Sequence, residues 1–288
     1  MNLAGHTLPF WSLQLIIALV LNSFLQAVQV GAYAARVAGV MTGRIGTSIS
    51  LFNLFVTASR FANMFYAPML GTLADRAGYA LRDPALAAAE ATQFEWQMRA
   101  IVIAGTAGTL LGAIFLPTFV YIFERGVGAF ERRGSIPSSL LRLSDPRVWF
   151  DIVRTVRIPS LHVFSRYSLK DVPAKLLIGN VLVTGVYAIG VVASYYASIL
   201  RPDVARTALS ASGLVNGIAT IAFAVIVDPT SAYIVDQAAK GERTLANVKS
   251  MVFYLALTAV IGTLLSQALL YPAAWFIGGA AKFVSAIH

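Results

Sequence analysis

A single arginine lies in the middle of a long, otherwise uncharged stretch of this sequence. Arg60 interrupts the run from Ile45 to Ala74, and in a helix it would lie roughly 24 Å from Arg44. Its guanidinium stays charged and offers a planar fork of N–H donors that suits phosphate oxygens. In hydrocarbon this group costs about 2.5 to 3.5 kcal/mol, so it should face protein, water or an anion. We therefore expect a phosphate-bearing ligand at Arg60. The alternatives are snorkelling to the membrane interface and pairing with a buried carbonyl.

Polar side chains form two stripes at helical spacing, one of which contains Arg60. The first consists of Gly46, Ser50, Asn53, Thr57, Arg60, Asn63 and Met64, and the second of Asn22, Gln26, Gln29, Tyr33 and Arg36. A weaker stripe follows later, at Asn180, Thr184, Tyr187, Ser194 and Ser198. Two adjacent helices joined by a short loop can turn the first two stripes toward one hydrophilic cavity. The alternative is that these side chains hydrogen-bond from helix to helix.

The motifs of several enzyme classes are missing. There is no phosphate-binding loop of the GxxxxGK[ST] type, no HExxH pair and no cysteine, so we expect no catalytic residue, no cofactor and no metal. A lipid-phosphate phosphatase using His162, Ser165 and Arg166 stays an alternative function. A membrane scaffold that transports nothing is another. Asp228, followed by Pro229, is expected to cap or end a helix.

The composition predicts which elements position these residues. Hydrophobic residues make up 58% of the 288 and charged residues only 12%, with a mean hydropathy of +0.73, whereas soluble domains carry about 25% charged residues. Uncharged stretches long enough to cross a bilayer must be helical, because backbone groups cannot stay unpaired in hydrocarbon. We predict an all-α, polytopic membrane helix bundle in one domain, 1–288. About six transmembrane helices are expected, at 10–35, 45–70, 100–123, 176–200, 207–227 and 250–277.

The basic residues indicate how the chain is oriented. With six spans, fifteen of them lie on one side and six on the other, so the positive-inside rule places the first side in the cytoplasm and both termini outside. The net charge of +9 then indicates contact with anionic membrane lipids rather than with nucleic acid. Most of the excess comes from the loop 124–175. Its apolar face at Val148, Trp149, Ile152, Val153 and Val156 predicts a helix on the membrane surface or one packed on the membrane domain.

Two further patterns concern packing and symmetry. Glycines at 105, 108 and 112, and at 213 and 217, predict close contacts between helices. The second and fifth predicted spans each carry a central asparagine, Asn53 or Asn216, and end near Pro68 or Pro229. This pattern is compatible with a 3+3 inverted repeat, a plan found in transporters whose site lies at the midplane.

Longer segments resemble a known family. They are Arg36 to Arg44, Ser48 to Asn53, Ser59-Arg60, Asn63-Met64, Ala67-Pro68, Leu70-Gly71, Ser212 to Thr220 and Val227 to Pro229. These residues are similar to those of the Amj family, the alternative lipid II flippases of bacterial cell-wall synthesis. The resemblance extends over most of the chain. Where the family has a carboxylate in its first span this chain has Gln29, which puts ion coupling at that position in doubt.

The resemblance implies a multi-pass protein of the bacterial cytoplasmic membrane. Its substrate would be lipid II, an undecaprenyl-pyrophosphate glycopeptide that moves from the inner to the outer leaflet. Cell-wall synthesis proteins would be further contact partners. For that substrate we expect Arg36 and Arg44 to collect the pyrophosphate at the cytoplasmic side and Arg60 to draw it outward. Sugar and peptide would bind the amides Gln26, Gln29, Asn53 and Asn63.

Overall fold

The computed structural model describes residues 9–133, 154, 156 and 167–287, except for the side chains of residues 58–60 and 131–133. This part of the chain is helical and contains no strand. Its elements are α1 (Leu13–Gly31), α2 (Ala34–Thr42), α3 (Ile45–Ala80), α4 (Ala87–Ile114), α5 (Leu116–Arg133), η2 (Leu169–Asp171), α9 (Ala174–Leu200), η3 (Pro202–Val204), α10 (Ala205–Ser210), α11 (Ser212–Ala222), η4 (Phe223–Val227), α12 (Asp228–Ala239) and α13 (Leu245–Ser285).

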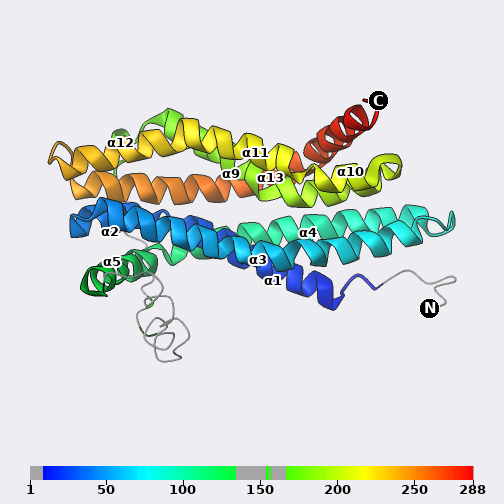
Figure 1. The fold of residues 1–288 in the computed structure, drawn as a ribbon, viewed down its shortest axis with the longest axis horizontal. Helices are drawn as coiled ribbons and strands as arrows, with labels where there is room; N and C mark the ends of the chain where they lie inside the picture. The colour runs from blue at the N-terminus through cyan, green and yellow to red at the C-terminus, as the bar shows by residue number, and fades with distance from the viewer. Residues whose placement is uncertain (1–8, 134–153, 155, 157–166, 288) are drawn as a thin grey trace.

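The helices form two layers that follow the order of the chain (Figure 1). One layer contains α1 to α5 and the other α9 to α13. The start of α1 and the end of α13 lie at the end where α10 begins, which we call the α10 end. The opposite end, the α2 end, contains the turn after α2, helix α5 and the turn between α12 and α13. The described parts of the basic segments that the sequence places on one side therefore lie at the α2 end.

The membrane helix bundle predicted from composition is confirmed. In the described residues, five helical segments are long and apolar enough to cross a bilayer: Leu13–Thr42, Ala87–Ile114, Ala174–Leu200, Pro202–Ala239 and Leu245–Ser285. Helix α3 has 36 residues, which is sufficient in length to cross as well, but it is not one of these five. The count of six spans thus stays a prediction.

Three predicted spans are each divided in the structure. Residues 207–227 fall into α10, α11 and η4. Residues 10–35 fall into α1 and α2, which meet at Ala32 and Tyr33 without a proline. Residues 100–123 fall into α4 and α5, which meet at Phe115. There Pro117 lies in the first turn of α5, a position that tolerates proline because no helical donor is needed.

The helices continue past the prolines at which we expected them to end. Helix α3 contains Pro68 and runs on to Ala80. At Pro229 the chain continues as α12, and the residues directly before it form η4, a π-helical turn. Proline lacks an N–H and its ring crowds the carbonyl four residues earlier, so a wider turn at this point relieves the crowding.

Glycines allow α1 and α4 to approach closely, as predicted. A Cβ at Gly108 would overlap the main-chain carbonyl of Ser23, and one at Gly112 would lie 2.6 Å from the main-chain oxygen of Ala27. Gly105 faces the side chain of Asn22. The same prediction for Gly213 and Gly217 is wrong within the described chain, because a Cβ at either glycine would meet open space.

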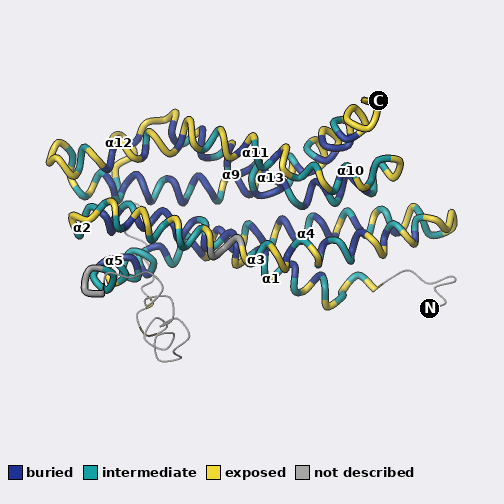
Figure 2. Tube along the Cα trace, viewed as in Figure 1, coloured by how far each residue is buried: buried dark blue, intermediate teal, exposed yellow. Residues whose placement is uncertain are grey.

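Two buried apolar clusters join the layers, one toward each end. The cluster toward the α10 end includes Leu70, Met98, Ile189 and Leu270. The cluster toward the α2 end includes Val37, Leu176, Val248 and Leu255. Figure 2 shows the buried residues along facing sides of the helices and exposed residues along the outer side of α11 and α12. Both layers contribute to each cluster, so the hydrophobic effect holds them together along their length.

Candidate functional site

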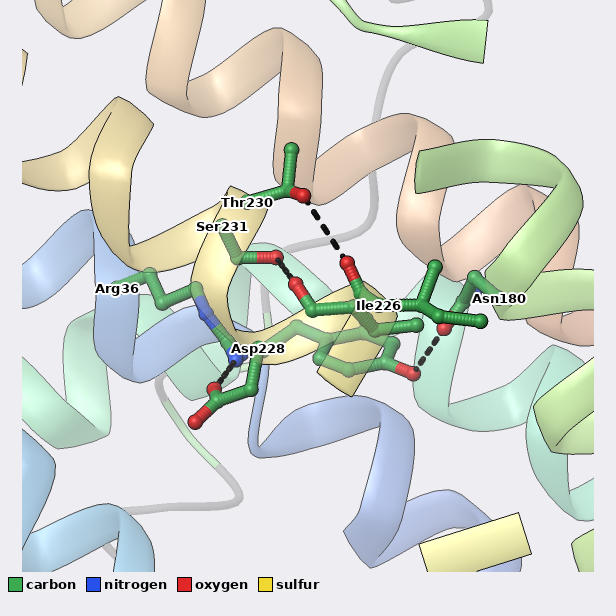
Figure 3. Close-up of polar contacts among 8 residues, drawn as sticks. Arg36, Asn180, Ile226, Asp228, Thr230 and Ser231 are labelled. Carbon is green, nitrogen blue, oxygen red and sulfur yellow. Dashed lines mark hydrogen bonds and ion pairs between the residues drawn. The ribbon is translucent and has the colours of Figure 1, made fainter. Parts of the chain in front are cut away.

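An ion pair joins the two layers near the α2 end. Nη2 of Arg36, on α2, donates to Oδ1 of Asp228, the first residue of α12, at 2.8 Å (Figure 3). The two residues are 192 positions apart. The Arg36 side chain is 10% exposed and that of Asp228 is 57% exposed. The arginine is therefore enclosed by protein, whereas its carboxylate partner lies at the surface.

The rest of the Arg36 guanidinium is surrounded by aromatic rings. Its Cζ lies 5.7 Å from the ring centre of Tyr33 and 5.5 Å from that of Phe52, which is on α3. Both distances allow a cation–π attraction. Nη1 is buried and has no hydrogen-bond partner among the described residues. A buried N–H donor without an acceptor is costly, so one arm of the guanidinium fork lacks the acceptor that an anion could supply.

A buried hydrogen-bond network positions the helix that carries Arg36. The Tyr33 hydroxyl donates to Oδ1 of Asn180 on α9 at 3.0 Å. Nδ2 of Asn180 donates in turn to the Leu255 carbonyl at 2.8 Å and to Oγ1 of Thr258 at 2.9 Å, both on α13. Asn180 is fully buried. Because Tyr33 lies at the junction of α1 and α2, this network fixes the direction of α2 relative to α1.

The backbone around Asp228 is irregular. After the π-helical turn, Oγ1 of Thr230 donates to the Ile226 carbonyl at 3.0 Å, and Oγ of Ser231 donates to the Val227 carbonyl at 2.7 Å (Figure 3). Serine and threonine bonds to the carbonyl four residues earlier tend to bend a helix. With Pro229 in the same turn, the start of α12 combines three features that locally loosen or bend helices.

The other six predicted site residues are distributed along α1 and α3. Gln26 is buried beside Gly105 of α4, and Gln29 is partly buried. Arg44 is the exposed N-cap of α3, and Asn53 is exposed on the same helix. Asn63 is partly buried. Arg60 lies within α3, but its side chain falls outside the described part of the chain.

Some side chains of the polar stripes form helix-to-helix hydrogen bonds, which was the alternative to a hydrophilic cavity. Nδ2 of Asn22 donates to the Ile101 carbonyl on α4 at 2.8 Å, and Tyr33 bonds to Asn180 as above. These side chains serve helix-to-helix hydrogen bonds. On α3, in contrast, Ser50, Asn53 and Thr57 are exposed. Arg36, the last residue of the other stripe, approaches Phe52 on α3, the residue before Asn53.

Two pockets lie near the ends of the molecule. One, at the α10 end, is lined by Pro9, Ser12, Leu73, Arg76, Ala77, Glu90, Gln93, Phe94 and Gln97. The other, at the α2 end, is lined by Lys170, Asp171, Val172, Pro173, Gln237, Glu242, Arg243 and Asn247. Neither contains a predicted site residue. His162, Ser165 and Arg166, as well as Val148, Trp149, Ile152 and Val153, lie outside the described residues.

Sequence reasoning included Arg36 but did not assign Asp228 to the site. It treated Asp228 as a helix cap, although this is the one carboxylate directly after the uncharged run 207–227. A carboxylate next to a membrane helix usually has a cationic partner, and that rule was the available signal. Asn180 and Tyr33 were noted only as members of stripes, because periodicity does not reveal which helix faces which.

Comparison with known proteins gives two matches of nearly full length. A family model described as "Amj: Alternate to MurJ" matches residues 21–281. The protein named "Lipid II flippase Amj" from Bacillus subtilis (strain 168) is 34% identical over 260 residues, which cover 90% of this chain and 93% of that protein. No solved structure matches the chain.

Proposed function

Because this chain belongs to the Amj family, we propose that it is a lipid II flippase and not an enzyme. It moves the undecaprenyl-pyrophosphate-linked peptidoglycan precursor from the inner to the outer leaflet of the bacterial cytoplasmic membrane. Such a protein must give a charged, sugar-bearing head group a polar path while the polyprenyl tail stays in lipid. No bond of the substrate is made or broken.

One observation carries the proposal: a nearly buried arginine with an unused donor lies between the two halves of a membrane bundle. Arg36 is 10% exposed, and its Nη1 has no partner in the described part of the chain. Arginine binds phosphate groups with two parallel N–H bonds, and pyrophosphate offers several acceptor oxygens. Arg36 is therefore the contact we assign to the pyrophosphate of lipid II.

Other predicted residues complete the path. The exposed Arg44, at the start of α3, draws the anionic head group toward the membrane from the α2 end. Arg60 receives it further along α3. The amides Gln26, Gln29, Asn53 and Asn63 bind sugar and peptide; since Gln26 is buried beside α4, it becomes available only when α1 and α4 rearrange.

We place the α2 end in the cytoplasm and both termini outside. The basic segments at that end, which include Arg44, Lys170, Lys175 and Lys240, favour this orientation by the positive-inside rule. In the proposed direction of transport, from the inner to the outer leaflet, the head group enters at this end. The concentration gradient of the lipid, its consumption outside, or the membrane potential then drives net transport.

The test is transport by the purified protein. Proteoliposomes that contain the protein and fluorescent lipid II should expose the label to an external quencher faster than empty liposomes do. The variant Arg36→Gln, which retains a polar side chain of similar length, should be slow, whereas Arg206→Gln, an exposed residue at the α10 end, should match the parent. If the parent protein moves lipid II no faster than protein-free liposomes, and also does not rescue cells depleted of their main lipid II flippase, the proposal is wrong.

A further inference from the structure

Asp228 is the surface partner of an enclosed cation. Its carboxylate is 57% exposed, and it bonds through Oδ1 to Nη2 of Arg36, whose side chain is 10% exposed. An exposed ion pair contributes little free energy, because water and salt compete for both charges. Here water reaches the carboxylate much more easily than the guanidinium. The contact can therefore break on the Asp228 side while Arg36 stays where it is.

Arg36 is not fully satisfied by Asp228. The carboxylate uses one arm of the guanidinium fork, and Nη1 is buried without an acceptor in the described chain. A phosphate or pyrophosphate group presents more oxygens than Asp228 supplies here and can bond to both arms at once. Such an anion and Asp228 would compete for the same guanidinium.

The two layers are held together by different kinds of contact. Helices α4 and α13 are joined by hydrogen bonds to main-chain carbonyls, including one from Oγ1 of Thr106 to the Thr263 carbonyl at 3.0 Å. Near the α2 end, the Tyr33–Asn180 hydrogen bond links the layers in the interior, and the Arg36–Asp228 pair joins α2 and α12 where Asp228 is exposed. Asp228 follows a π-helical turn and precedes Pro229, features that commonly mark functional irregularities in helices.

We propose that Asp228 is an exchangeable counter-ion for Arg36, which a phosphate-bearing lipid head group displaces. Without lipid, Asp228 neutralises Arg36 and holds α12 against α2. When the head group binds, Arg36 transfers to the phosphate, Asp228 is released to water, and α12 moves away at the π-helical turn. This inference rests on the proposed function, and it assigns to Asp228 the role of a positioning residue that tunes affinity and closure.

Binding of undecaprenyl pyrophosphate to the detergent-solubilised protein tests the competition. Asp228→Asn keeps the shape of the side chain but removes its charge. The variant should bind this lipid about three- to fivefold more tightly, because competition from an exposed ion pair lowers the lipid affinity by about that factor. Asp236→Asn, an exposed carboxylate on the same helix, controls for a general loss of negative charge and should bind as the parent does. Arg36→Gln should lose most of the affinity.

Distance measurement tests the release of α12 independently of transport. The chain contains no cysteine, so spin labels can be attached to Met41→Cys on α2 and Tyr233→Cys on α12, both at exposed positions. The parent should show a short distance that lengthens on addition of undecaprenyl pyrophosphate. With Asp228→Asn the longer distance should be about three- to fivefold more populated without lipid than in the parent. The charge exchange Arg36→Asp with Asp228→Arg should restore the short distance but should not respond to lipid.

The outcomes separate this inference from the proposed function. If Asp228→Asn binds lipid with the parental affinity and shows the parental distance, Asp228 is not an exchangeable counter-ion, even if the parent transports lipid II. If the lipid displaces Asp228 as described but the parent moves no lipid II, the counter-ion role stands and the transport function fails. Circular dichroism of each variant shows that the helices are intact.

Discussion

Arg99 and Gln267 exchange hydrogen bonds between the two layers in both directions. Nη1 of Arg99, on α4, donates to the Gln267 carbonyl at 3.3 Å, and Nε2 of Gln267, on α13, donates to the Arg99 carbonyl at 3.2 Å. Nε of Arg99 also donates to Oε1 of Glu95 at 2.8 Å. The charge of Arg99 is thus neutralised on its own helix while the same side chain holds the opposite layer.

Replacing Gln267 with leucine should destabilise the protein through this contact. The change keeps the side-chain size but removes the donor to the Arg99 carbonyl, and polar contacts between membrane helices contribute about 0.5 to 1.5 kcal/mol. We expect a loss of that size in the free energy of unfolding in detergent. Thr92→Val is the control, because its hydroxyl donates only within its own turn of α4, to the Ala88 carbonyl. Equal stability of the Gln267 variant and the parent would show that the exchange is not a stabilising contact.

A methyl group at Gly108 should separate α1 from α4. The new Cβ would overlap the main-chain carbonyl of Ser23, and backbone atoms cannot rotate away as a side chain can. Overpacking of this kind costs about 1 to 3 kcal/mol, so Gly108→Ala should lower the unfolding temperature. Gly213→Ala meets open space and should be neutral or stabilising by up to about 1 kcal/mol, since alanine favours helix. A Gly108→Ala protein as stable as Gly213→Ala would contradict the close approach.

Replacing Asn180, at the centre of the buried network, should lower the free energy of unfolding more than replacing Tyr33, at its edge. Asn180→Ala removes bonds to Tyr33, Leu255 and Thr258 at once, and each buried group left unpaired costs about 1 to 3 kcal/mol. Tyr33→Phe removes one hydroxyl and leaves Asn180 bonded to α13, so its cost should be about 1 kcal/mol. Unfolding in detergent compares the two. The reverse order of stability would mean that the network does not have Asn180 at its centre.

The sequence predicts where the helices lie better than it predicts which helices contact one another. The uncharged run at 176–200 coincides with most of α9, because hydrocarbon requires a continuous helix there. The junction of α1 and α2 contains no proline from which it could be predicted. Helix α12 continues past Pro229 because the π-helical turn before it makes room for the proline ring. Helices also extend beyond the apolar runs, as α3 does to Ala80, since nothing in water forces a helix to end where the hydrocarbon does.

The candidate site could be predicted only in part, for a different reason. Arg36 could be predicted as a site residue, because it is charged and is the last member of a polar stripe. Its pairing with Asp228 depends on how α2 and α12 pack across 192 positions of sequence, and periodicity within one helix contains no information about that packing. Asn180 was assigned to a stripe of its own helix, while its bonds connect three helices.

The orientation of the chain can be tested with single cysteines in this cysteine-free protein. Ser285→Cys, near the end of α13, should react in intact cells with a maleimide that cannot cross the membrane. Lys240→Cys, in the turn between α12 and α13, should react only after the cells are permeabilised. This result is expected because the basic residues at the α2 end favour the cytoplasm. The opposite labelling pattern would invert the topology and with it the direction of the proposed path.

Arg60→Ala is the sharpest test of the route along α3. Residue 60 lies far from both ends of α3, and we expect Arg60 to bind the head group after Arg36 does. Bonds to charged groups contribute about 1.5 to 3 kcal/mol, so the variant should move fluorescent lipid II across proteoliposomes roughly ten- to a hundredfold more slowly. Arg206→Ala, at the exposed α10 end, controls for loss of one positive charge and should keep the parental rate. Equal expression and membrane insertion of both variants is checked first. If Arg60→Ala then transports at the parental rate, the head group does not pass along α3 by way of Arg60.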